Sequence, residues 1–461
     1  MSITTPEEHI PPAGPLDVTE LDAAVAGPVL TPDDADYPTE LAGFNAAATP
    51  APAVVVGATS PADVAEAVRY ARANGLRVGV RATGHGPVIS GRGHLTITTS
   101  RMTDIQVDAA AKTARVAAGV RWRDLAPATA PHGLTGLVGS SSSVGIVGYT
   151  LGGGLSPLGR QFGFAADRVR RIELVTADGV IRTVDAGAGS DLFWALLGGR
   201  DGCGIVTAIE LDLIDLATIY GGGVFFAGDA AEQVLHAWRD WAPTLPDTAG
   251  SSVAIVRLPP DPNLPPPLQG QTVVHVRFTY TGDPAVGAQL LAPMMSAGPV
   301  LLSNVDVLPT AALDAVHMDP PGPLPSVERG CGIRDLPAEA VDAVLAVAGP
   351  QVASPLAIVE IRLLGGALAS PQGVPNAVTG RAARYCVTAI GVPAGPLGDQ
   401  AGAHVAAVNG ALSPWASDGL LNFAGQTPAA ELSTLWTAAD WSRLEEIRRR
   451  HDPAGMFTRI G

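Results

Sequence analysis

Positive charge is scarce in this sequence. The 29 Lys and Arg residues are outnumbered by 44 Asp and Glu, and the formal net charge is −15. Lys112 is the only lysine, and the one tight basic run, at residues 448–450, fits the last turn of a helix. Nucleic acid and anionic membranes would repel such a chain. We therefore expect neither a nucleic-acid nor a membrane partner.

Long apolar runs and paired cysteines are also missing. No stretch of about eighteen apolar residues occurs, and residues 1–15 lack the charged start and apolar core of a signal peptide. The three cysteines, Cys203, Cys331 and Cys386, lie far apart and form neither a disulfide framework nor a CxxC metal cluster. We expect a cytoplasmic protein with buried free thiols and no metal site.

Two nucleotide-binding motifs are lacking as well. No G-x-G-x-x-G follows an expected strand and no G-x-x-x-x-G-K-[S/T] is present, so a Rossmann or P-loop site is unsupported. What is present is a compact composition, 47% hydrophobic and 16% charged. A chain of 461 residues exceeds one hydrophobic core, which suggests two or three domains.

The first regular unit carries a histidine between two glycines. Residues 54–56 read as a strand, and Ser60-Pro61 with Asp63 begin a helix that Asn74-Gly75 ends. Residues 77–80 read as a second strand, which leads directly into Gly84-His85-Gly86. Glycine lets a loop turn sharply and approach a ligand, so this β-α-β unit places His85 in a binding loop.

Residues 139–154 form the most glycine-rich stretch of the chain. Apolar residues recur within it at Val144, Ile146, Val147 and Leu151, too regularly for a flexible linker. Backbone N–H groups of such a run can bind a pyrophosphate without a cation. We interpret it as part of a cofactor site.

The region after about residue 217 alternates helices and strands. In the expected strand 357–364, Glu360 and Arg362 oppose Val359 and Ile361, and in 272–280 His275 and Arg277 oppose their apolar neighbours. One apolar face on helices and one polar face toward a cavity would explain both strands; a solvated polar face would explain them equally well. At the C-terminus we expect a short strand at 420–423 and a helix at 441–450.

In their order, these segments resemble a family of flavoproteins. The His85 loop, the run 145–154, the segments 160–167, 191–195 and 204–207, and His451-Asp452-Pro453 are similar to the vanillyl-alcohol-oxidase type of FAD oxidoreductases, and most similar to its berberine-bridge-enzyme-like branch. The likeness is strong over residues 50–215 and 420–459. It implies an α+β fold with a two-part FAD-binding domain and an α+β substrate domain built on an antiparallel sheet.

The resemblance implies a division of the chain into four segments. These are a leader at 1–48, the FAD-binding domain at 49–216, the substrate domain at 217–409, and a C-terminal segment at 410–461 that completes the FAD domain.

The resemblance also implies which residues bind FAD. In the family the loop histidine is bonded to the flavin, and His85 stands at the position of that histidine. Many members have a second bond to the flavin through a cysteine, but this chain has Ser141 at that position. We thus expect FAD attached through His85 only. The other expected FAD-binding residues are Arg81, Ala82, Thr83, Gly84, Gly86, Pro87, Ser142, Ser143, Val144, Gly145, Gly148, Tyr149, Gly153, Gly154, Gly204, Val206 and Asn422.

The expected activity is that of an oxidase. Val144 occupies the family position that admits oxygen to the flavin, so hydride would pass from substrate to flavin N5 and O2 would reoxidise it to give H2O2. Glu360 is the first candidate for the base, because burial would raise its pKa. Tyr149 is second and would need activation. Arg362 and His275 are further catalytic candidates.

Two alternatives stay open. One is a dehydrogenase that uses another electron acceptor, and the other is a non-redox flavoprotein that templates a cyclisation or isomerisation. Aromatic residues are only 5% of the chain, which offers little for stacking on sugars, so we expect a small hydrophobic alcohol, hemiacetal or similar natural product as substrate.

Overall fold

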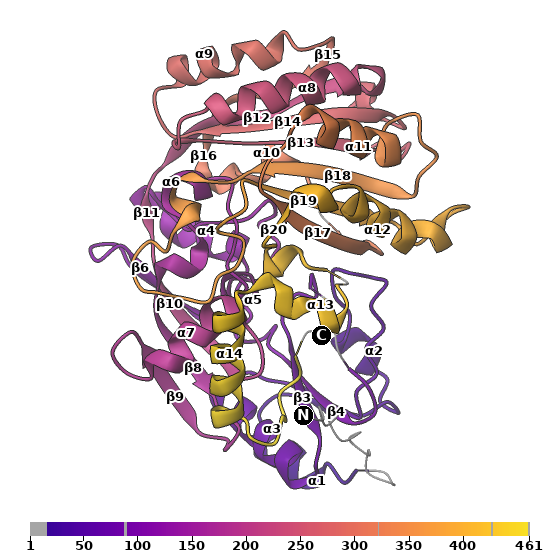
Figure 1. Cartoon of the computed structure of the whole chain (residues 1–461). Coiled ribbons are helices and arrows are strands. Elements are labelled where there is room, and N and C mark those ends of the chain that lie inside the picture. Colours follow the sequence, from indigo (N-terminus) through magenta and orange to yellow (C-terminus); the bar gives the residue numbers. More distant parts are fainter. Residues whose placement is uncertain (1–15, 87–89, 321, 426, 460–461) are drawn as a thin grey trace.

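The computed structural model describes residues 16–86, 90–320, 322–425 and 427–459. Figure 1 shows a large sheet covered by helices at one end of the molecule and two smaller sheets at the other. The mixture of antiparallel sheets and helices confirms the expected α+β class.

A four-stranded sheet carries the expected β-α-β unit. Its strands, in spatial order, are β1 (Val29–Leu30), β2 (Val54–Gly57), β4 (His94–Thr98) and β3 (Arg77–Arg81). Both β2 and β3 run parallel to β4, which lies between them. Helix α3 (Pro61–Ala73) joins β2 to β3, and the Oγ of Ser60 accepts a hydrogen bond from the Asp63 amide, which confirms the expected cap. Helix α1 (Thr19–Ala24) precedes the sheet, and α2 (Tyr37–Glu40) lies between β1 and β2 in the chain.

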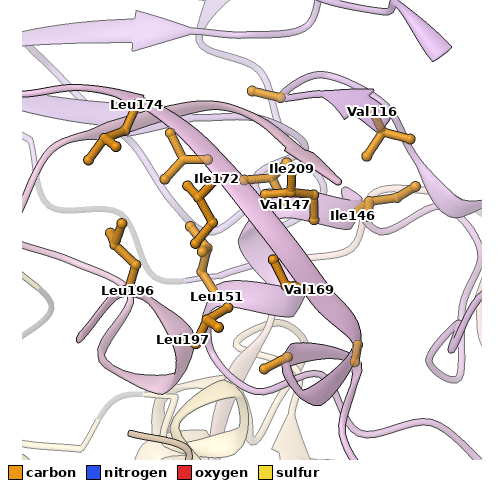
Figure 2. Packing of buried hydrophobic residues seen from close by; sticks show 14 of the residues in the cluster. Val116, Ile146, Val147, Leu151, Val169, Ile172, Leu174, Leu196, Leu197 and Ile209 are labelled. Atoms are coloured by element: carbon orange, nitrogen blue, oxygen red, sulfur yellow. The ribbon is translucent and has the colours of Figure 1, made fainter. Parts of the chain in front are cut away.

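A five-stranded antiparallel sheet stands next to it. Its strands, in spatial order, are β5 (Ile105–Asp108), β6 (Thr113–Ala117), β10 (Ile205–Asp212), β8 (Val169–Val175) and β9 (Ile181–Asp185). Helices α4 (Trp122–Thr129), α5 (Ile146–Leu151) and α7 (Ser190–Gly199) belong to the same region. Figure 2 shows Ile146, Val147 and Leu151 of α5 packed with Ile172 and Ile209 of the sheet. The apolar residues of the glycine-rich run therefore anchor it to the core. A two-stranded sheet pairs β7 (Leu134–Thr135) with β11 (Ile214–Asp215).

The remaining sheet is large and antiparallel. Its strands, in spatial order, are β15 (Val300–Ser303), β12 (Thr218–Ala227), β14 (Thr272–Tyr280), β13 (Ala249–Arg257), β18 (Leu356–Leu363), β19 (Tyr385–Gly391), β17 (Val327–Ile333) and β20 (Ala416–Ser417), with β16 (Asp306–Pro309) also paired to β12.

One face of the large sheet is apolar and covered. Helices α8 (Ala231–Trp241), α9 (Pro284–Met295), α11 (Ala338–Ala348) and α12 (Ala401–Ala411) lie over it in Figure 1. Val359 and Ile361 of β18 are buried in the cluster on this side. Because side chains alternate along a strand, Glu360 and Arg362 project from the other face. On that face His275, Arg277 and Glu360 are 1–4% exposed, so the expected polar face is buried rather than solvated.

The C-terminal segment returns to the smaller sheets. Helix α14 (Ala438–His451) packs on α7, where Arg448 donates hydrogen bonds to the carbonyls of Gly199 and Asp201. The expected strand at 420–423 is wrong, because residues Leu421–Phe423 form a 3-10 helix closed by hydrogen bonds to the carbonyls of Leu420 and Leu421. This turn brings the Asn422 side chain against Gly152. A short helix, α13 (Ala429–Leu432), follows.

The described helices include none that combines the length and the apolar composition needed to cross a membrane. The boundaries at residues 49, 217 and 410 stay predictions.

Candidate active site

His85 lies in the loop that follows β3. Its Nδ1 is 2.8 Å from the Thr83 hydroxyl, its Nε2 is 3.2 Å from the Ser143 hydroxyl, and its ring stacks on Phe44 at a centroid distance of 4.0 Å. Burial, together with the nearby charge of Arg121, lowers the pKa of His85 to about 4. The imidazole is therefore neutral at pH 7 and held on three sides. Pro87, also expected to bind FAD, lies outside the described residues.

Arg81 at the end of β3 supplies a buried cation. Its side chain is 4% exposed, and Nη1 donates to the Leu41 carbonyl. Nε and Nη2 have no hydrogen-bond partner among the residues that the structure describes. Gly43 and Gly84 lie against the guanidinium and leave no room for a Cβ. A buried guanidinium with two unused N–H groups fits a phosphate oxygen.

The glycine-rich run lies beside the His85 loop. A Cβ on Gly145 would contact Ala82 and Thr83 at 3.5 Å, so the two loops are neighbours. A Cβ on Gly86 or Gly148 would meet no described atom within 4 Å, so both loops are open at these positions. Gly153 and Gly154 have φ angles of 110° and 78°, which other residues rarely adopt.

Asn422 closes this cradle from the C-terminal segment. Its Nδ2 donates to the Tyr149 carbonyl at 2.7 Å, and its side chain lies over Gly152. Asn422 thus lies against the glycine run, and its role in binding FAD stays a prediction. Arg81 and the open glycine backbones are the chemistry that a dinucleotide with a pyrophosphate requires, so the residues present fit FAD.

Four other expected FAD residues have different surroundings. The backbone N–H and hydroxyl of Ser142 both donate to Asp314, at 2.7 and 2.5 Å, which ties this loop to helix α10 (Asp314–His317). The Val144 carbonyl accepts from the Trp122 amide at 3.2 Å. Gly204 packs against β8 with a φ of 155°, and Val206 is buried in β10. The packing of Gly204 and Val206 inside the sheet accounts for a small and an apolar residue at these positions without a bound ligand.

Glu360 forms the centre of a charge cluster on the polar face of the large sheet. Its Oε1 lies 2.6 Å from Arg277 Nη1, accepts from the Ser252 hydroxyl at 2.6 Å, and lies 3.5 Å from His317 Nε2. Its Oε2 accepts from Arg362 Nε at 2.9 Å. The side chain is only 5% exposed. Both carboxylate oxygens are thus occupied by donors.

The expected pKa of Glu360 is wrong in direction. Burial does raise its pKa, but the charges of Arg277 and Arg362 and the His317 hydrogen bond outweigh burial, and the pKa lies well below 4.5. A carboxylate stabilised by two guanidinium groups holds its charge and is a poor proton acceptor near neutral pH. The cluster therefore favours a positioning role for Glu360 over that of a base.

Tyr149 is not activated either. Its hydroxyl donates to the Leu137 carbonyl at 3.0 Å, and its ring packs edge-to-face on Trp122 at 5.7 Å. Burial raises the pKa of the phenol, and the charge of Arg362 offsets only part of this effect. The activation that a base at this position would need is absent among its described contacts.

The other two catalytic candidates, Arg362 and His275, have different neighbours. The Arg362 guanidinium lies 5.1 Å from the ring of Phe423, next to Asn422. His275 stacks on Phe225 at 3.9 Å, and its Nδ1 accepts from Arg277 Nε at 3.2 Å. Burial, with the charge of Arg277, lowers the pKa of His275 well below 6.5. A neutral His275 therefore orients Arg277.

A cavity joins the polar face to the end of the glycine run. Its lining includes Leu155, Ser156 and Pro157 after the glycines, Ser252, Arg277 and Arg362 on the sheet, and His317 on α10. Ser252, Arg277 and His317 were not among the expected site residues. The alternation in 249–257 could have indicated Ser252, whereas nothing in the sequence around His317 predicts that α10 reaches the sheet.

Comparison with known proteins identifies an FAD binding domain in the N-terminal part of the chain. The profile of an FAD binding domain family matches residues 52–185. The (R)-6-hydroxynicotine oxidase of Paenarthrobacter nicotinovorans is 30% identical over 229 residues, which are 49% of this chain and 47% of that protein. The matching part of the chain thus spans about half the length of this curated relative.

Two solved structures have the same fold. The BBE-like 1 protein of Physcomitrella patens superposes with a TM-score of 0.84 at 19% identity, over 96% of this chain and 98% of that one. The 6-hydroxy-D-nicotine oxidase of Arthrobacter nicotinovorans gives 0.80 at 24% identity, over 94% and 96%. The chain therefore carries an FAD binding domain at residues 52–185 and has the same overall fold as these two proteins.

Proposed function

We propose that this protein is an FAD-dependent oxidase that takes hydride from a small, hydrophobic natural product, such as an alcohol or hemiacetal, and uses O2 as the reoxidant. The observation that carries this proposal is the cavity between the glycine-rich run and the polar face of the large sheet. The FAD binding domain and the oxidase names of relatives support it.

The residues divide into two groups by role. FAD, when bound, supplies the two-electron acceptor. The buried guanidinium of Arg81 would hold its diphosphate, and the open backbones of Gly86 and Gly148 would let it approach. Asn422 fixes the glycine run from the C-terminal segment. The substrate would then lie between these loops and the sheet.

The cavity is small, about 30 Å³, and its lining would suit the polar end of a hydrophobic substrate. Leu155, Val316, Leu363 and Leu368 provide apolar surface, while Arg277 and Arg362 provide donors. The two guanidinium groups would orient the substrate oxygen. Burial of this surface would exclude water from the reacting carbon.

We also propose that His85 is the single covalent tether of the cofactor. Its neutral imidazole has a nucleophilic nitrogen, and Phe44 fixes the plane of the ring. Ser141 lies 2.7 Å from Ser143, which in turn contacts His85, and a serine offers no thiol for a second bond. An imidazole bonded to the flavin would withdraw electrons and favour hydride acceptance.

The proposal is tested with purified protein in two steps. Acid precipitation should leave the yellow colour in the pellet, and release of all colour to the supernatant would contradict the covalent bond. Peroxide is then measured with 6-hydroxynicotine, a chito-oligosaccharide and menthol as probes. Peroxide formation and loss of two hydrogens from one probe support the oxidase. Reduction that needs an artificial acceptor would indicate a dehydrogenase, and an unchanged product mass a non-redox flavoprotein.

A further inference from the structure

Glu328 lies on the same face of the large sheet as Glu360. In β17, Glu328, Gly330 and Gly332 alternate with Cys331 and Ile333, and these two pack in the cluster under the helices. Gly330 pairs with Thr388 of β19, which in turn pairs with Glu360 of β18. Glu328 is two residues from Gly330 along its strand. The polar face therefore holds a second carboxyl group near the edge of the sheet.

Two contacts place Glu328 beside the expected FAD-binding residues. A Cβ on Gly425 would come within 3.0 Å of Glu328 Cγ, and Gly425 is three residues after Asn422. On the other side, the Asn45 amide exchanges hydrogen bonds of 3.0 and 3.1 Å with the backbone of Ser326. The Asn45 backbone amide donates to the Gly84 carbonyl in the His85 loop. Glu328 thus lies between the His85 loop and the Asn422 turn.

Glu328 differs from Glu360 in its partners. Within the described ranges its carboxyl group has no hydrogen bond and no ion pair, whereas Glu360 contacts two arginines, a serine and a histidine. Glu328 is half-buried, and this partial loss of water, with no partner to offset it, raises its pKa to about 7. A carboxyl group of this kind changes its protonation state in the neutral range, which suits proton transfer.

Charged groups on the surrounding elements do not neutralise Glu328. Arg329 belongs to the opposite face of β17 and pairs with Glu431 of α13 at 2.5 Å. Arg362 and Glu360 lie two strands away and pair with each other. The turn at 421–425 and the segment 43–46 contribute no charged residue.

We propose that Glu328 is the general base of the oxidation, an assignment that rests on the proposed function. As the substrate carbon–hydrogen bond breaks, its electron pair and hydrogen pass to the flavin. The substrate O–H bond breaks at the same time, its proton goes to the Glu328 carboxylate, and the carbonyl forms. Reoxidation by O2 consumes the two electrons and two protons, including the one from Glu328, to give H2O2. Glu360, two strands away on the same face, keeps Arg362 in place at the cavity.

The first test needs no substrate. The flavin absorbance of the holoprotein is titrated from about pH 5 to about pH 9, a range centred on the raised pKa. We expect a spectral change with a midpoint near 7 in the wild type, because a carboxylate beside the ring alters its electrostatic surroundings. Glu328→Gln should abolish the change. The control is Glu339→Gln, an exposed glutamate on α11 under the opposite face of the sheet, which should retain it. A wild type without the change, or Glu328→Gln with it, overturns the proposal.

The second test measures anaerobic flavin reduction by stopped flow with 6-hydroxynicotine, a chito-oligosaccharide and menthol. The wild-type rate should increase as pH rises through 7, because the base must be ionised. Glu328→Gln should lose this dependence and react about 100-fold more slowly or worse, with its flavin content and circular dichroism unchanged.

The outcomes separate this assignment from the proposed function. If none of the probes reduces the flavin of the wild type, the result contradicts the oxidase function and, with it, the role of Glu328 as the base. A wild type that is reduced no faster than Glu328→Gln contradicts Glu328 alone.

Discussion

Replacing Glu360 by glutamine tests the charge cluster most directly. Glutamine keeps the shape and can still accept from the Ser252 hydroxyl, but it removes the charge that neutralises Arg277 and Arg362. These two side chains are 3% and 12% exposed, so water cannot replace the carboxylate. Leaving buried charges without a partner costs about 3–5 kcal/mol. The free energy of unfolding should fall by this amount.

The expected shift in Tm follows from the size of the unit that unfolds. For a cooperative unit of about 150–250 residues, each kcal/mol corresponds to roughly 2–4 °C, which gives a decrease of about 10 °C. The assay is a thermal melt followed by circular dichroism, with Glu339→Gln as the matched control. A decrease of less than about 2 °C at neutral pH would refute the reasoning.

The pH dependence of this difference has a defined sign. The pKa of Glu360 is lowered on folding, so its ion pairs stabilise the protein above 4.5 and are lost as pH falls through the lowered pKa. The gap in Tm between the wild type and Glu360→Gln should be complete at neutral pH and narrow only in strong acid. If Glu360 is not the base, the rate of flavin reduction in Glu360→Gln should be slower but should keep its dependence on pH near 7.

Three further predictions concern the cofactor and the second carboxyl group. His85→Ala should release its flavin into the supernatant on acid precipitation, and a yellow pellet would contradict a tether at His85. Arg81→Gln should lower the flavin content of the purified protein, measured as the ratio of flavin to protein absorbance, because the buried N–H groups for the diphosphate are lost; a full complement of flavin would refute this role. Glu328→Gln should raise the free energy of unfolding at alkaline pH by up to about 3 kcal/mol, because the wild type loses stability as pH rises from 4.5 to about 7 and its half-buried carboxyl ionises. Equal melting curves of the two proteins across this range would contradict the raised pKa.

The site illustrates how far local sequence reasoning extends. The helix at Pro61–Ala73 begins at its Ser60 cap, and the alternation at 358–363 gives the two faces of β18 correctly. The same reasoning failed at 420–423, where an apolar run forms a 3-10 helix. The carbonyls of Leu420 and Leu421 accept hydrogen bonds within this turn, and the turn packs Asn422 on Gly152, a contact that local sequence does not reveal.

The sequence by itself determined many of the elements, the glycine-rich loops and the resemblance to FAD oxidoreductases, because caps, periodicity and glycine positions act over a few residues. Only the tertiary structure decided the chemistry of the carboxyl groups. Glu360 has a lowered pKa because Arg277, from another strand, lies 2.6 Å away. Glu328 has a raised pKa because folding removes much of the water around its carboxyl group without giving it a partner. A pKa depends on neighbours in space and on burial, and neither can be read from residues adjacent in the chain.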